Sequence, residues 1–279
     1  MSKLATYIRY HVQSKGINFV ESTDPTTDVN PEIEHAIWFN YESGEFFICI
    51  DNTPNKNIWR GDKGSLIQPE TVYVVDIFED GSCVALWPMN GSLADLSGLY
   101  NGSWWRNKVA RFIPGKFDKA VSPYRNAQAI LPTPFNKDTT IATVSFWFKW
   151  NGRNSQMPIG WYRYDIYIYS GSLGFNTGNG DIYGIDFRPY KNKWTHIVAE
   201  FHKGEYGKLW INGEPVTLTQ RRGKIYTPNA VLDKNLRVFG WGSSTSYRNP
   251  GPVDQVRLFN RALTDEEVLR LYHEVGGTK

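Results

Sequence analysis

The chain has 279 residues, enough for one large β domain or two smaller ones, because domains average about 100 to 200 residues. It carries 31 Lys and Arg against 28 Asp and Glu, a formal net charge of +3 at pH 7. This surplus is too small to predict a basic groove for nucleic acid. Hydrophobic residues make up 41% of the chain, which excludes a chain that is disordered throughout.

The aromatic content indicates the fold class. The chain contains 11 Trp, 16 Tyr and 15 Phe, together with 25 Gly and 15 Pro. Aromatic residues favour strands, and Gly and Pro favour turns. The composition therefore predicts an all-β protein and argues against a helical bundle.

Membrane insertion and secretion are not expected. No window approaches the roughly 18 consecutive apolar residues that a membrane helix needs. The start of the chain has a single early lysine, Lys3, and Arg9 and His11 interrupt it before an apolar stretch forms, so we expect no signal peptide. Cys49 and Cys83 lie in apolar runs without metal-site spacing, which predicts buried free thiols.

The first 70 residues read as a small β module. Alternating side chains predict strands over residues 6–12, 17–20, 36–40 and 46–50, and the last two flank a turn at 41–44. The Gly- and Ser-containing residues 61–65 have the composition of a linker. We therefore place a domain boundary near residue 70 and assign residues 71–279 to a second, larger domain.

Strand signals recur through the second domain at intervals of roughly 8 to 15 residues, as in a β-sandwich or jelly roll. They cover residues 143–150, 164–169, 196–201, 209–211, 236–239 and 253–259. The pair Asn212 and Gly213 predicts a hairpin turn. One helix is expected near the C-terminus, because Thr264 and Glu267 form a capping box before an apolar face that includes Val268, Leu271, Tyr272 and Val275.

Several segments of the larger domain share one resemblance. Residues 87–98, 112–120, 193–213 and 253–268 resemble the laminin-G-like family of concanavalin-type jelly rolls, in the same order and spacing. The resemblance covers about residues 71–279. It implies two antiparallel sheets packed face to face, the architecture that the strand periodicity also suggests.

The small module has a resemblance of its own. Residues 37–53, followed by Trp59, resemble a short β module common in bacteriophage tail fibre and receptor-binding proteins. The resemblance implies a virion protein made in the host cytoplasm, assembled as a homotrimer and attached to other tail or baseplate proteins. The module would then serve attachment or trimer assembly.

Motifs for catalysis are absent from the sequence. Retaining glycosidases need two carboxyl groups about 5 to 5.5 Å apart, and the strand pattern that supplies them in jelly-roll glucanases does not occur. We interpret Asp165, Asp181 and Asp186 as turn or surface residues. The five histidines show no metal or triad spacing, and His196 is interpreted as a structural strand residue.

No cofactor is expected. Residues 176–181 are rich in the oxygen ligands that calcium prefers, so a structural calcium ion is an alternative that this loop leaves open. The preferred interpretation is a Gly- and Asn-rich turn.

Sugar binding is the remaining candidate activity. A sugar ring has an apolar C–H face and a polar rim, so its sites pair aromatic rings with amide, hydroxyl and Arg donors. Three loops carry this mixture, and the longest, with the best odds, begins at Trp241. The candidate binding residues are Trp241, Tyr247, Arg248, Trp161, Tyr162, Trp104 and Trp105.

The sequence therefore predicts a phage tail fibre protein that recognises a host-cell surface polysaccharide through a lectin-like domain, without catalysis. Two alternatives remain open. One is a glycan depolymerase on the same jelly-roll fold, with carboxylates converging from distant strands. The other is a purely structural trimerising cap of a fibre.

Overall fold

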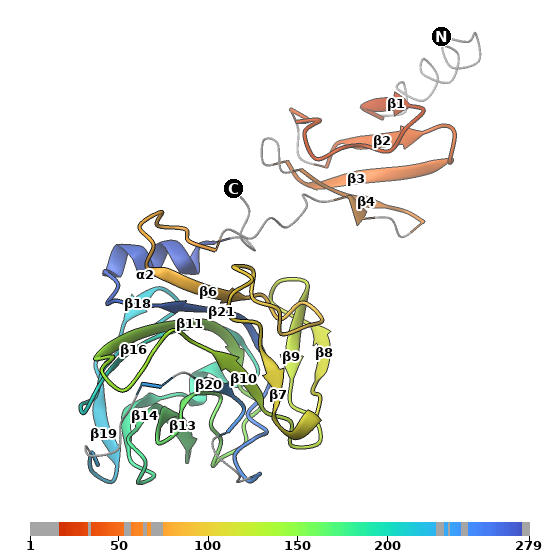
Figure 1. The fold of residues 1–279 in the computed structure, drawn as a ribbon. Coiled ribbons are helices and arrows are strands. Elements are labelled where there is room, and N and C mark those ends of the chain that lie inside the picture. The colour runs from red at the N-terminus through yellow and green to blue at the C-terminus, as the bar shows by residue number, and fades with distance from the viewer. Residues whose placement is uncertain are drawn as a thin grey trace. The chain divides into compact units, whose positions relative to one another are not determined.

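The computed structural model describes residues 17–32, 35–52, 57–63, 66–67, 75–226, 232–233, 235–240 and 245–274 (Figure 1). The chain divides into two compact units, residues 1–72 and 73–277, close to the predicted boundary near residue 70. The predicted strand over 6–12 and Val275 of the predicted helix lie outside the described residues. Among the described helices, none has the length and apolar character to span a membrane.

The first unit contains one five-stranded sheet with the order β1-β2-β3-β4-β5. Strand β1 pairs parallel with β2, and the other pairs are antiparallel. Gly44 has a φ of +65° in the predicted turn, which other residues adopt only with strain. The strands are β1 (Phe19–Glu21), β2 (Ile37–Asn40), β3 (Glu45–Asp51), β4 (Ile58–Gly61) and β5 (Leu66–Ile67).

A small aromatic core holds the first unit together. The rings of Trp38 and Trp59 meet edge to face, 6.0 Å apart between centroids, and Phe47 packs beside them. Cys49 is buried among these rings as a free thiol, as predicted. The alternation of the β2 and β3 residues thus gives this sheet one face for the core.

The second unit is a sandwich of two sheets. The first sheet has the order β18-β17-β16-β11-β21-β9-β8, with β6 also paired to β21. The second sheet has the order β19-β15-β14-β13-β12-β20-β10-β7. The first sheet contains β6 (Cys83–Trp87), β8 (Arg111–Pro114), β9 (Lys119–Ser122), β11 (Ile141–Lys149), β16 (Trp194–His202), β17 (Lys208–Ile211), β18 (Glu214–Pro215) and β21 (Val253–Phe259). The second contains β7 (Ser103–Trp104), β10 (Ala129–Pro132), β12 (Ile159–Trp161), β13 (Tyr164–Tyr169), β14 (Ser172–Asn176), β15 (Ile182–Asp186), β19 (Thr219–Arg222) and β20 (Asn235–Val238). Two single-turn 3₁₀ helices, η1 (Trp105–Asn107) and η2 (Arg188–Tyr190), lie in loops.

Apolar side chains from the inner faces of both sheets fill the space between them. Val144, Phe146 and Phe148 of β11 contribute from the first sheet, and Ile166 and Ile168 of β13 from the second. Each such side chain stabilises the fold by about 2 kcal/mol when it leaves water. The two-sheet arrangement confirms the predicted all-β sandwich with a short C-terminal helix.

The helix α2 (Asp265–Tyr272) is held by the predicted capping box. Thr264 Oγ1 accepts a hydrogen bond from the Glu267 backbone N–H at 3.2 Å, and Glu267 Oε2 accepts one from the Thr264 N–H at 2.9 Å. Val268 and Leu271 are buried against the first sheet beside the sandwich core. The helix therefore closes one face of the sandwich and leaves the second sheet uncovered by helices (Figure 1).

Candidate functional site

The face of the second sheet that points away from the core, here called the outer face, carries polar side chains in register. On β20, Leu236 and Val238 enter the core, so Arg237 between them lies on the outer face. Arg237 pairs with Gly160 of β12, and Gly160 pairs with Asp165 of β13. Alternation along each strand thus sets a polar row across the sheet.

A second row contains two glycines. Tyr167 of β13 pairs with Gly174 of β14, which pairs with Gly184 of β15. A Cβ on Gly174 would come within 2.2 Å of the Tyr183 carbonyl oxygen, so the strands approach closely there. At this row the outer face therefore has a floor of two glycines, without side chains, on β14 and β15.

Arg222 from edge strand β19 reaches over this floor. Its guanidinium carbon lies 4.0 Å from the ring centroid of Tyr169 on β13, although β14 and β15 lie between their strands. This distance is that of a cation–π contact. Tyr169 and Tyr167 stack at 6.2 Å, so an aromatic strip continues along β13.

The three loops in which the sequence predicted sugar binding meet beside this face. The Met157 N–H donates to the Tyr247 carbonyl at 3.1 Å, which joins the second loop to the third. Arg248 Nη1 donates to the Asn126 carbonyl at 2.9 Å. The first loop joins the same segment, because the Trp105 N–H donates to the Gln128 carbonyl at 2.9 Å.

Arginines lie against aromatic rings at several places around the outer face. Distances from the guanidinium carbon to the ring centroid are 5.3 Å for Arg163 and 5.9 Å for Arg237 on Tyr162, 5.7 Å for Arg106 on Trp105, and 3.7 Å for Arg111 and 5.0 Å for Arg125 on Tyr124. Such pairs combine a flat apolar surface with several N–H donors. This is the combination that a sugar ring requires.

Three candidates from the sequence offer a ring near this surface. Tyr162 is 40% exposed, and Trp105 and Tyr247 are half-buried. Tyr247 packs edge to face against Tyr167 at 6.1 Å, so it belongs to the outer face. Trp241 lies outside the described residues.

The other candidates serve the fold. Trp161 is fully buried, and its indole N–H donates to the Asp233 carbonyl at 2.8 Å, so the prediction of a sugar platform is wrong there. Trp104 is the inward-facing neighbour of Ser103 and packs against the core. Arg248 is 2% exposed and holds two loops together. These side chains position the site without facing a ligand.

Sequence reasoning missed several residues of the outer face, among them Tyr124, Tyr169, Arg222 and Arg237. The alternation of Tyr167 and Tyr169 with Ile166 and Ile168 did mark two opposite faces. The sequence did not indicate which face of this strand points to solvent, because both faces carry apolar or aromatic side chains.

The comparisons with known proteins agree with this architecture. Residues 124–269, just over half of the chain, match the family described as the concanavalin A-like lectin/glucanases superfamily. The chain belongs to this superfamily. No curated protein matched the sequence.

Three solved structures are similar to the chain at low sequence identity. Domain 4 of the GH43 arabinanase AbnA from Geobacillus stearothermophilus is 18% identical with a TM-score of 0.48, over 69% of this chain and 98% of that one. The binding domain of Paraclostridial Mosquitocidal Protein 1 is 17% identical with a TM-score of 0.48, over 69% and 52%. The receptor-binding domain of botulinum neurotoxin D is 18% identical with a TM-score of 0.48, over 68% and 52%.

Because the superfamily includes glucanases, the carboxylates of the second sheet require attention. Asp165 is 2% exposed, and its Oδ2 accepts a hydrogen bond from Asn176 Nδ2 at 2.9 Å. Burial raises its pKa well above the ordinary value. Asp181 is fully buried and accepts from the Tyr206 hydroxyl at 2.9 Å. The interpretation of Asp165 as a turn or surface residue is therefore wrong, because it lies buried on β13. Asp181 does belong to a turn, although it is buried as well.

Asp186 agrees better with its interpretation as a turn or surface residue. Asp186 is partly exposed and pairs with Arg188 at 2.7 Å, and the hydrogen bonds from Arg188 lower its pKa to about 2. Asp186 thus stays ionised and bound to its neighbour.

Loop 176–181 uses its oxygens internally. Asp181 accepts hydrogen bonds from the Thr177 N–H at 3.0 Å and the Thr177 hydroxyl at 2.8 Å. Asn176 Oδ1 accepts from the Gly178 and Gly180 N–H groups at 3.2 and 2.9 Å. Within the described ranges, no three His, Cys, Asp or Glu side chains gather in a way that could hold a metal ion. The loop is built as a hydrogen-bonded turn.

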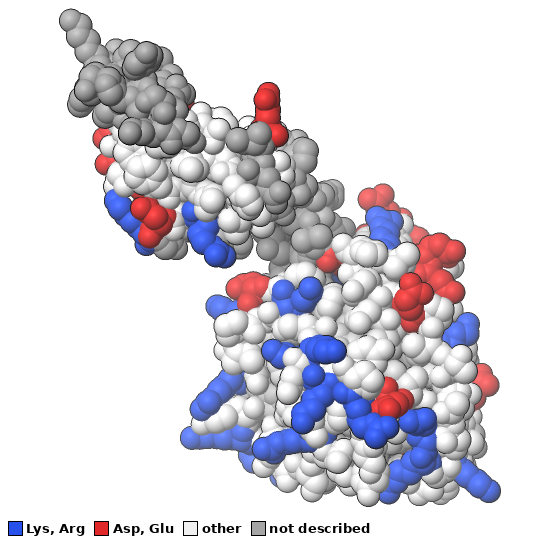
Figure 2. All heavy atoms as spheres, turned by 180° about the vertical axis from the view of Figure 1, so that it is seen from behind, with Lys and Arg blue, Asp and Glu red and all other residues white. Residues whose placement is uncertain are grey.

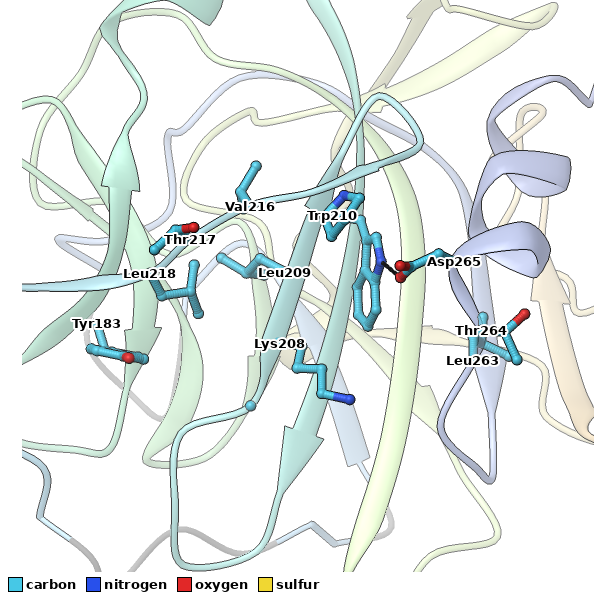
Figure 3. A pocket seen from close by; sticks show the side chains of 12 residues that line it. Tyr183, Lys208, Leu209, Trp210, Val216, Thr217, Leu218, Leu263, Thr264 and Asp265 are labelled. Atoms are coloured by element: carbon cyan, nitrogen blue, oxygen red, sulfur yellow. Dashed lines mark hydrogen bonds between the residues drawn. The ribbon is translucent and has the colours of Figure 1, made fainter.

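A separate pocket of about 620 Å³ lies at an edge of the sandwich, lined by β17, β18 and the start of α2 from the first-sheet side and by Tyr183 of β15 from the second sheet (Figure 3). Trp210 forms one wall, and its indole N–H donates to Asp265 Oδ1 at 2.7 Å. Leu209, Val216 and Leu218 line the apolar side (Figure 3). Because Trp210 and Asp265 satisfy each other, this pocket offers fewer free polar groups than the outer face.

Proposed function

We propose that the second unit is a non-catalytic lectin that binds a host-cell surface polysaccharide on the outer face of its second sheet. The observation that carries this proposal is the meeting of three loops, distant in sequence, around a face lined with tyrosines and arginines. Membership of a superfamily of lectins and glucanases supports it. Tyr162 would stack against a sugar ring and Tyr169 would hold Arg222 in place, while the arginines donate hydrogen bonds to the polar rims.

The proposal extends to a bacteriophage tail fibre. The aromatic strand pair of the first unit and its Trp59 resemble the β module of such fibres, and this unit would attach the chain to other tail or baseplate proteins. A homotrimer would bring three weak sites to one surface, and avidity would then exceed the affinity of each site.

An experiment on the purified full chain distinguishes a protein that only binds a glycan from one that also cleaves it. A panel of bacterial surface polysaccharides is immobilised, and affinity is measured for the unchanged protein and for Tyr162→Ala and Tyr169→Ala. We expect binding to at least one glycan, with each variant weakening it about fivefold, since an aromatic contact contributes on the order of 1 kcal/mol per ring. The exposed Leu99→Ala, outside the aromatic set, serves as control and should bind as before.

Release of reducing ends from the bound glycan is measured in parallel. Sustained turnover would replace the non-catalytic proposal with a depolymerase. Failure of every glycan to bind would overturn the lectin proposal altogether. For the fibre, light scattering should give three times the mass of one chain, and the purified protein should block phage adsorption; a monomer without blocking activity would contradict that role.

A further inference from the structure

The near-neutral charge of the chain hides a strong asymmetry. Residues 101–250 contain 21 Lys and Arg against 9 Asp and Glu, whereas the remainder contains 10 against 19. Three of the nine acids, Asp165, Asp181 and Glu200, are buried and add little negative charge to the surface. Residues 101–250, which form the whole second sheet together with six strands of the first sheet, are therefore basic, contrary to what the total charge implied.

The basic side chains gather on one part of the larger unit. In Figure 2, Lys and Arg side chains cover the lower half of this unit, whereas Asp and Glu lie mostly near its upper end. Figure 1 places β13, β14 and β20 of the second sheet in that lower half. Positive potential is thus concentrated where the outer face lies.

The arginines of the outer face differ from those elsewhere in what they contact. Arg257 pairs with Glu274, and Arg261 with Asp80 and Glu267, on the side of the helix. By contrast, six arginines of the outer face and of neighbouring segments lie on aromatic rings, and in the part of the chain that the structure describes none of these six forms an ion pair with a carboxylate: Arg106, Arg111 of the first-sheet strand β8, Arg125, Arg163, Arg222 and Arg237. Arg188 differs from them, because it pairs with Asp186 of β15. A ring holds the flat face of a guanidinium and leaves its N–H edge available for a bidentate contact with an acid group.

These pairs are linked across the outer face. Tyr124 and Arg125 adjoin Asn126, whose carbonyl binds Arg248. Tyr247, next to Arg248, packs on Tyr167, and Tyr167 stacks with Tyr169 beneath Arg222. The rings of Tyr247, Tyr167 and Tyr169 and the guanidinium of Arg222 therefore form one contiguous group, and the buried Arg248 joins it to the segment of Tyr124 and Arg125.

We infer that the ligand of the outer face is an anionic glycan, a polysaccharide with carboxylate or phosphate groups recurring along its chain. This inference rests on the proposed lectin function and specifies its ligand. Sugar rings lie on the tyrosines, and the acid groups bind the N–H edges of the neighbouring arginines. A neutral glycan would leave this row of cations without partners.

The test uses the full chain and bacterial surface polysaccharides that contain uronic acids or phosphodiesters. Each is offered in its native form, after chemical reduction of its carboxyl groups to alcohols, and after removal of its phosphate. We expect the native form to bind and removal of its acid group to weaken binding at least tenfold. Whichever treatment abolishes binding identifies the acid as carboxylate or phosphate.

Two variants locate the contact. Arg222→Gln and Arg163→Gln should each reduce affinity for the native glycan at least fivefold and reduce its dependence on salt. The control is Lys137→Gln with Lys203→Gln, which removes two exposed charges from the ends of β11 and β16 in the other sheet. This double variant should bind within twofold of the unchanged protein, and thermal unfolding checks that every variant is folded.

The outcomes separate this inference from the function on which it rests. Equal binding to native and neutralised glycans would overturn the anionic ligand while the lectin proposal stands. Binding to no glycan would overturn both. Equally tight binding of a 20-nucleotide single-stranded DNA, with the same loss in Arg222→Gln, would show a general polyanion surface and overturn the glycan-specific inference.

Discussion

Arg222 lies over the ring of Tyr169 at 4.0 Å across two intervening strands. Gly174 and Gly184 favour the contact, because they place no side chain on the outer face in their row of those strands. A cation that would move freely at a sheet edge is thereby fixed above an aromatic ring. The position of this charge depends on backbone packing beneath it, not only on the two residues that meet.

The glycine floor should be intolerant of a single methyl group. In Gly174→Ala, the new Cβ would meet the Tyr183 carbonyl oxygen at 2.2 Å and Gly184 Cα at 2.6 Å, so the strands must separate. We expect a loss of about 3 kcal/mol in the free energy of unfolding, measured by urea titration. The control Gly81→Ala has open space but a φ of +76°, and should cost about 1 kcal/mol. A smaller loss for Gly174→Ala than for Gly81→Ala would contradict this account.

The sequence allowed the strands and the helix to be predicted because their signals are local. The alternation in β11 and the Thr264 and Glu267 capping box each involve residues that are close in the chain. The Arg222 and Tyr169 contact could not be predicted, since it requires the sheet order in which β19 follows β15. Whether Trp161 faces the core or solvent depends on which face of a short strand is covered, which its neighbours in sequence do not reveal.

Trp161 and Tyr162 are adjacent in sequence and should separate stability from binding. Trp161→Phe removes the hydrogen bond to the Asp233 carbonyl and part of a filled core, so we expect a loss of about 2 kcal/mol in stability. Its affinity for a glycan that the unchanged protein binds should stay within twofold. Tyr162→Ala should show the reverse, with stability within about 0.5 kcal/mol and weakened binding. If a folded Trp161→Phe variant lost affinity for the glycan, Trp161 would be shown to contribute to binding.

The capping box of α2 should contribute measurably to stability. Thr264→Ala leaves the Glu267 backbone N–H without its acceptor, and we expect a loss of about 1 kcal/mol. Thr264→Ser keeps the hydroxyl oxygen and should retain most of the stability. Equal stability of the Ala and Ser variants would show that the cap is dispensable.

His196 should make the fold less stable in acid. Its Nε2 lies 2.8 Å from Ser145 Oγ, and burial, with the nearby charge of Arg257, lowers its pKa to about 3. Between pH 6.5 and 3 the unfolded chain binds a proton that the folded chain does not, so stability falls as the pH falls, by up to about 1.4 kcal/mol per pH unit. His196→Gln should flatten this slope by up to one proton, measured by urea unfolding at each pH. An unchanged slope would show that the imidazole is protonated in the folded protein.

Asp254 should make the fold less stable as the pH rises, the opposite of the effect of His196. Its Oδ2 accepts hydrogen bonds from the Lys116 and Phe117 N–H groups at 2.8 and 2.9 Å, yet burial raises its pKa to about 7. The folded chain therefore holds a proton that the unfolded chain loses near pH 3.9, and the resulting stability, complete below pH 4, is lost as the pH rises to 7. Asp254→Asn keeps an oxygen for both N–H groups and cannot ionise. From pH 4 to 7 the variant should gain stability relative to the unchanged protein, by as much as about 4 kcal/mol. The variant Asp138→Asn, at an exposed position, serves as control, and its stability should change with pH as that of the unchanged protein does. If the stability of Asp254→Asn also changed with pH in this way, Asp254 would be ionised throughout this range.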